Sequence, residues 1–117
     1  MTELVDRYEM SPVHLAVETD DLAELTRLLD VGHDPNEFDS YSGWTPLLRA
    51  IDGEADGSAQ TGQPLEAAGT AVLLAYGADP QQPSRDGLTP YHLAFQSGHE
   101  MAVRLIEAHT ARRRTAG

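Results

Sequence analysis

Carboxylates and histidines are the side chains of this 117-residue chain whose types could support chemistry. Asp52, Glu54 and Asp56, followed by Gly57, have the spacing of the first ligands and the glycine of an EF-hand calcium loop. Such a loop ends in a glutamate that binds calcium through both oxygens, but Gln63 stands at that position. We therefore expect this segment to hold no metal, and we expect no cofactor elsewhere.

The histidines give no sign of catalysis. A catalytic or metal-bound histidine acts with converging partners, and the sequence has no nucleophile elbow, no H-E-x-x-H motif and no P-loop. The absence of cysteine excludes thiolate chemistry. A pair of catalytic carboxylates is the enzymatic alternative that stays open. We predict that the chain is not an enzyme and assign no catalytic role to His14, His33, His92, His99 and His109.

Net charge indicates the class of partner. Nineteen acidic residues against eight arginines give −11, and because three arginines stand at 112–114, residues 1–111 carry −14. Such a surface repels nucleic acids and anionic membranes and favours basic proteins, although acidity can also serve solubility alone. The chain lacks the roughly 20 apolar residues of a membrane span and the features of a signal peptide. We therefore expect a cytoplasmic protein.

A six-residue pattern occurs three times along the chain. It reads Ser-Pro-Val-His-Leu-Ala from Ser11, Thr-Pro-Leu-Leu-Arg-Ala from Thr45 and Thr-Pro-Tyr-His-Leu-Ala from Thr89. A second pattern, Gly-x-Asp-Pro, follows the first two copies at Gly32 and Gly77. Both patterns resemble the ankyrin repeat, and this resemblance implies an all-α solenoid of stacked helix-turn-helix units with extended finger loops.

The spacing of the copies sets the expected domain organisation. The pattern recurs after 34 and then 44 residues, against a family period of about 33 residues, so the second unit contains a long insertion. We expect a single ankyrin-repeat domain over 1–117. Its parts are repeats at about 6–38, 39–83 and 84–110, an insertion at about 52–63 and a basic C-terminal tail at 111–117.

Local signals predict where the helices begin and end. A hydroxyl residue followed by proline can cap a helix and supply its first turn, which predicts the start of each inner helix. Tyr91 and Phe95 are expected on the packed side of the last inner helix, and the motif histidines His14 and His92 are expected to bond to neighbouring groups. The outer helices are expected to begin near Asp21, at Pro64 and after Gly98, and to close at Gly32 and Gly77.

The insertion is rich in glycine, acidic and small residues, a composition typical of an irregular segment. One interpretation is a flexible connection that the fold tolerates. The other is a loop that contacts a partner, because long loops of repeat proteins often lie on the binding face. The sequence leaves both open.

Recognition by ankyrin proteins generally uses the finger tips and the exposed ends of the inner helices, which line a concave groove. The resemblance therefore implies a groove in which acidic and aromatic residues alternate. Aromatic side chains are common interface anchors, although Trp44 could equally pack against the next repeat. The expected partner-binding residues are Tyr8, Glu18, Phe38, Tyr41, Trp44, Asp52, Glu54, Asp56, Arg85, Leu88 and Gln96.

These features favour a protein-interaction module that is monomeric on its own. A small acidic ankyrin protein resembles the immunity proteins that neutralise toxins, whose nuclease members tend to be basic. The first hypothesis is therefore binding and inhibition of a basic partner such as a bacterial toxin. The use of arginine without lysine hints at a bacterial source. The alternative is a non-inhibitory cytoplasmic adaptor that docks an enzyme or a regulatory protein.

Overall fold

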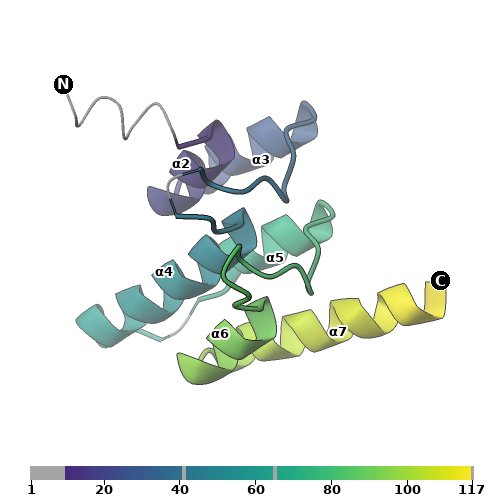
Figure 1. The fold of residues 1–117 in the computed structure, drawn as a ribbon. Coiled ribbons are helices and arrows are strands. Elements are labelled where there is room, and N and C mark those ends of the chain that lie inside the picture. The colour runs from purple at the N-terminus through teal and green to yellow at the C-terminus, as the bar shows by residue number, and fades with distance from the viewer. Residues whose placement is uncertain (1–9, 41, 65, 117) are drawn as a thin grey trace.

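The computed structural model describes residues 10–40, 42–64 and 66–116, with side chains given as far as Arg112. Within these ranges the helices form three pairs, each an inner helix followed by an outer helix, that stack in chain order (Figure 1). None of the described helices is long and apolar enough to cross a membrane. The inner helices are α2 (Pro12–Glu18), α4 (Pro46–Thr61) and α6 (Pro90–Gln96), and the outer helices are α3 (Leu22–Asp30), α5 (Ala68–Ala75) and α7 (Glu100–Ala116).

The inner helices begin where the sequence predicts. The hydroxyl oxygens of Ser11, Thr45 and Thr89 each accept the backbone N–H three residues on, at 3.1 to 3.2 Å. Proline fills the first turn, where the missing N–H costs nothing. Each hydroxyl-proline pair therefore fixes the start of one inner helix.

Gly32 and Gly77 follow the outer helices α3 and α5 and close them, also as predicted. Their φ angles are +104° and +99°, in the left-handed region where a Cβ is costly. The N–H of the next residue donates to the carbonyl five residues earlier, at 3.1 and 2.9 Å. This bond satisfies a helix-end carbonyl and turns the chain towards the finger.

The expected irregular insertion is helical, so that prediction is wrong. Helix α4 continues to Thr61 and ends where Gly62 takes a φ of +74°. Alanine, glutamate and glutamine in the segment favour helix, and buried Ala55 anchors its inner side. The prediction that the second outer helix begins at Pro64 is also wrong, because the chain must return along α4 before α5 begins at Ala68.

The expected basic tail is also helical. Helix α7 passes Thr110 and continues to Ala116, because no glycine closes it and because alanine and arginine favour helix. The arginines at 112–114 therefore lie near its C-terminal end, where positive charge is favourable to the helix dipole.

An apolar core runs through the stack between the inner and outer helices. Leu25 of α3, Leu47 and Ile51 of α4, Leu73 of α5 and Ala94 of α6 are all at most 1% exposed and belong to one cluster. Each pair thus buries its apolar side against its neighbours, as repeat proteins do.

The last inner helix departs from this pattern. Tyr91 is 43% and Phe95 70% exposed, although both are predicted to pack. The reason is their position, because no described helix lies beyond α6 to cover them (Figure 1).

Finger turns connect the pairs, as predicted. The N–H of Asp39 donates to the Trp44 carbonyl at 2.8 Å, and the Asp39 carbonyl accepts the Gly43 N–H at 2.7 Å. The N–H of Arg85 in the next finger donates to the Gly43 carbonyl at 3.0 Å, which links the two fingers. Gly43 has a φ of +72°, and a Cβ there would lie 3.2 Å from the Arg85 side chain. Glycine is therefore required at this turn.

Candidate protein-binding groove

A hydrogen-bond network centred on Arg49 joins the first two helix pairs. Its guanidinium donates to Glu18 Oε2 at 2.7 Å, and to Asp39 Oδ2 and Ser42 Oγ at 3.1 Å. Asp39 is 1% exposed, so its buried charge depends on Arg49 for compensation. Glu18, a predicted partner-binding residue, is half-exposed and already pairs with Arg49 across α2 and α4.

The two motif histidines differ. His14 is fully buried, and its Nε2–H donates to the Glu37 carbonyl at 2.8 Å, which confirms its structural role. Burial lowers the pKa of His14, because a proton on Nδ1 would find no partner among the described residues. His92 is exposed, and no ring hydrogen bond forms within the described part of the chain, so its expected bonding is wrong.

Glu54, a predicted partner-binding residue, has a structural role that the sequence analysis does not predict. Its Oε1 accepts the Thr70 hydroxyl at 2.7 Å, and its Oε2 accepts the Thr70 N–H at 3.2 Å. Helix α5 has Ala67 at its N-cap, which offers no side-chain acceptor. Glu54 therefore caps α5 from the neighbouring helix α4, and its side chain is only 14% exposed.

The same carboxylate reaches the third pair. His99 is fully buried, and its Nδ1 accepts the Ala102 N–H at 3.3 Å at the start of α7. With Nδ1 as acceptor, Nε2 carries the proton and donates to Glu54 Oε1 at 2.8 Å. Glu54 thus joins the N-termini of α5 and α7. The sequence analysis misses this role because it expects Glu54 in a loop.

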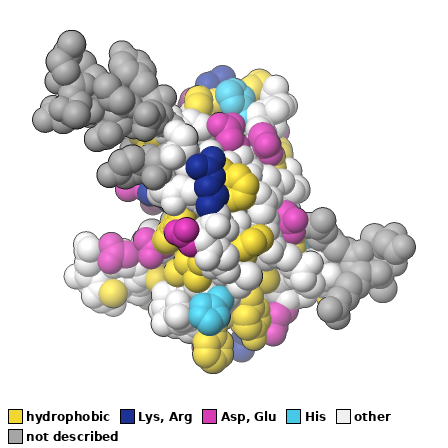
Figure 2. Space-filling view, viewed as in Figure 1, with side chains coloured by type: hydrophobic (Ala, Val, Ile, Leu, Met, Phe, Trp, Pro, Cys, Tyr) yellow, Lys and Arg dark blue, Asp and Glu magenta, His cyan; other side chains and the backbone are white. Residues whose placement is uncertain are grey.

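Asp52 and Asp56 are the predicted acids on α4 that stay exposed. They lie one turn apart, and Figure 2 shows acidic side chains over the projecting end of this helix. Partial burial and then the charge of Asp56 raise the pKa of Asp52. The helix turns Glu54 away from both of these side chains, so the three acids do not converge. Among the described residues, no group of three or more His, Asp or Glu could hold a metal.

The predicted finger residues are brought together in part. The Arg85 guanidinium lies over the Phe38 ring, 5.5 Å from its centroid, in cation–π contact. Trp44 and Leu88 are half-buried and pack against the core, which favours the packing interpretation of Trp44.

The other three predicted partner-binding residues are Gln96, Tyr8 and Tyr41. Gln96 is exposed at the end of α6. Tyr8 and Tyr41 lie outside the described residues, so their role as anchors stays a prediction.

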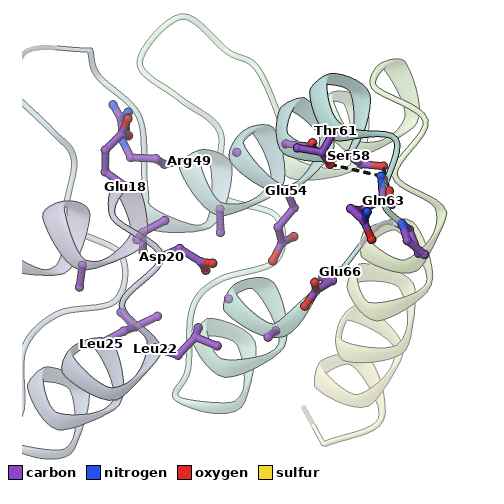
Figure 3. A pocket seen from close by; sticks show the side chains of 18 residues that line it. Glu18, Asp20, Leu22, Leu25, Arg49, Glu54, Ser58, Thr61, Gln63 and Glu66 are labelled. Atoms are coloured by element: carbon purple, nitrogen blue, oxygen red, sulfur yellow. Dashed lines mark hydrogen bonds and ion pairs between the residues drawn. The ribbon is translucent and has the colours of Figure 1, made fainter.

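A cleft of about 360 Å³ opens between the α2–α3 turn, α4 and the linker after α4 (Figure 3). Leu22 and Leu25 give it apolar surface, while Asp20 and Glu66 add carboxylates. Thr61 and its neighbours at the end of α4 supply one wall. The sequence analysis cannot find this cleft, because the wall exists only where the insertion is helical.

Comparison with known proteins places these observations in context. No family model matches the chain. Over 96 residues it is 41% identical to the human ARF GTPase-activating protein GIT1, covering 81% of this chain and 11% of that protein. It is 40% identical to mouse ARF GTPase-activating protein GIT2 over the same length, covering 81% of this chain and 12% of that protein. The chain thus spans about a tenth of the length of these curated relatives.

Solved structures agree with the fold. An ankyrin repeat domain from Acinetobacter baumannii AYE superposes with a TM-score of 0.73 at 28% identity, covering 89% of this chain and 50% of that one. The ankyrin repeat domain of Bcl-3 gives a TM-score of 0.70 at 25% identity, covering 83% and 38%. Such a fold supports a role in protein–protein interaction. With its repeated motif, capped helix pairs and linked fingers, the chain belongs to the ankyrin-repeat family.

Proposed function

We propose that this chain binds a basic protein through the groove formed by its inner helices and fingers, and inhibits it as an immunity protein inhibits a bacterial toxin in the cytoplasm. The observation that carries the proposal is the exposed acidic charge of α4. Asp52 and Asp56 face solvent, and within the described residues neither forms an ion pair with an arginine.

This arrangement is unfavourable for the isolated fold. Two carboxylates one turn apart destabilise a helix by about 0.2–0.5 kcal/mol. The raised pKa of Asp52 has part of its origin in the same repulsion. A lysine or arginine of a partner would offset this repulsion. The repulsion lowers the stability of the free protein, and its removal would add to the free energy of binding.

The nearest arginine does not cancel the acidic surface. Arg49 already pairs with Glu18 and with buried Asp39, so the potential above α4 stays negative. Acidic surfaces of this kind steer basic partners and raise the association rate. The groove is therefore suited to capture a basic protein quickly.

The test uses the partner isolated by affinity from the native host, followed by binding kinetics at two salt concentrations. We expect the double variant Asp52→Asn/Asp56→Asn to associate about tenfold more slowly at low salt, with a weaker salt dependence and little change in dissociation. The control Glu100→Gln/Glu107→Gln removes the same charge from α7 and should associate almost normally. An acidic partner, or equal effects of the two variants, would contradict the proposal.

One observation favours a non-inhibitory adaptor as the second candidate. The similar segment of GIT1 is a small part of a far longer protein, which is the setting expected of a docking module. The partner's own activity separates the two functions. Loss of that activity at saturating chain supports inhibition, whereas an unchanged activity supports docking alone.

A further inference from the structure

The end of the stack formed by α6 and α7, called here the terminal face, exposes an apolar surface. The rings of Tyr91 and Phe95 stack with centroids 6.4 Å apart and stay largely exposed. Beside them a hollow of about 630 Å³ is lined by Tyr91, Ile106, Thr110 and Ala111, and also by polar residues that include Glu107. Figure 2 shows hydrophobic side chains at this end of the molecule, over α6. We define the terminal face by Tyr91, Phe95, Ile106, Thr110 and Ala111.

The earlier inner helices show what such a face contacts. Helix α2 packs against α4, and α4 packs against α6. The equivalent side chains of α2 and α4 belong to the core cluster or pack against it. In both cases they are buried or half-buried, so the terminal face continues an interface that the molecule has already formed twice. The equivalent positions are Val13, Leu47 and Tyr91, and one turn later Val17, Ile51 and Phe95.

Charge opposes contact between two copies least at this end of the molecule. Residues 88–117 contain four arginines and two glutamates, a net charge of +2, so residues 1–87 carry −13. Two copies of this chain therefore repel each other through most of their surface, and least through the end formed by residues 88–117. Self-association is least opposed where the exposed aromatics lie.

We propose that the terminal face binds the same face of a second copy of this chain and forms a two-fold dimer. Helix α6 of one copy then covers, with its own Tyr91 and Phe95 side, the side of the other α6 that a following inner helix would cover. A two-fold arrangement covers both aromatic pairs at once, whereas end-to-end stacking would leave one uncovered at every step. The proposal goes beyond the groove function and replaces the monomer expected from the sequence analysis.

Sedimentation velocity of the whole 117-residue chain, from about 10 μM to 1 mM, tests the proposal. We expect a reversible monomer–dimer equilibrium. Phe95→Glu should raise the dimer Kd about tenfold or more, because it places a charge in a dry aromatic contact. The control Val31→Glu adds the same charge at a side chain that is 65% exposed on the first pair, and it should leave the Kd unchanged.

Circular dichroism of each variant checks that it is folded, and Tyr91→Ser provides a second, uncharged disruption of the same face. A chain that stays monomeric up to about 1 mM overturns the proposal. So does a folded Phe95→Glu or Tyr91→Ser variant that dimerises as well as the control. Oligomers larger than the dimer, whose size increases with concentration, would indicate end-to-end stacking and overturn the two-fold arrangement.

Discussion

At the scale of single residues, Glu54 holds together parts of the chain that are far apart in sequence. Its two oxygens receive hydrogen bonds from Thr70 at the start of α5 and from His99 at the start of α7. Hydrogen bonds to a carboxylate in a mostly buried site are stronger than hydrogen bonds to a neutral acceptor. The same side chain is therefore unsuited to steering a partner.

The first prediction concerns Glu54→Gln. The amide keeps the size of the side chain but loses the charge-assisted bonds, and its NH₂ group cannot accept one. We expect unfolding free energy to fall by about 1–3 kcal/mol in urea denaturation. Asp56→Asn is the control, because its exposed side chain should change stability by roughly 0.5 kcal/mol or less. Equal stability of Glu54→Gln and the wild type would refute the capping role.

The second prediction concerns His14 and pH. Its folded-state pKa is lowered by burial, so below about pH 6.5 the unfolded chain takes up a proton that the folded chain does not. Stability contributed by His14 is thus fully present above that pH and declines as pH falls. We expect the stability gap between the wild type and His14→Gln to shrink from pH 7.5 to pH 5 in denaturant titrations. A gap that is independent of pH would contradict this.

At the scale of elements, sequence patterns locate helix ends well where one residue fixes them. The hydroxyl-proline starts and the closing glycines Gly32 and Gly77 are predicted correctly because each acts through a local bond or a single φ angle. The extension of α4 is missed because its glycines and aspartates are poor helix formers on their own. What makes it helical is tertiary: Ala55 is buried, and Glu54 bonds to α5 and α7.

The third prediction tests that extension. Gly53 and Gly57 lie inside α4, and a Cβ at either would meet nothing within 4 Å. Gly53→Ala and Gly57→Ala should each raise the unfolding free energy by about 1 kcal/mol, which a loop would not show. Gly62→Ala is the matched control, because its φ of +74° disfavours a side chain and it should lower stability by about 1 kcal/mol. The three changes are compared by thermal and urea denaturation.

At the scale of the whole molecule, the repeat pattern describes the order of the stack but not which of its outer surfaces are covered. The stack and its order follow from three copies of one motif. Whether the apolar side of an inner helix is covered depends on the helix pair that lies next to it. Tyr91 and Phe95 are therefore predicted to pack and yet are exposed. The same reasoning explains the exposed His92, whose motif predicts a contact that only a following repeat could supply.

The last prediction concerns how the stack unfolds. Leu73 of α5 is fully buried in the core cluster that runs through all three pairs, so Leu73→Ala should cost about 2–5 kcal/mol. Because each pair is stabilised mainly by its neighbours, this loss should destabilise the whole chain.

The measurement compares two signals during urea denaturation. Trp44 is the single tryptophan and lies in the first finger, so its fluorescence reports on the junction between the first two pairs. Far-ultraviolet circular dichroism reports on all helices. We expect both signals to shift to the same lower urea midpoint in Leu73→Ala, with the half-buried Val72→Ala as a milder control. A variant whose fluorescence and helical signals separate would show that the first pair folds without the second, and the single cooperative stack would be wrong.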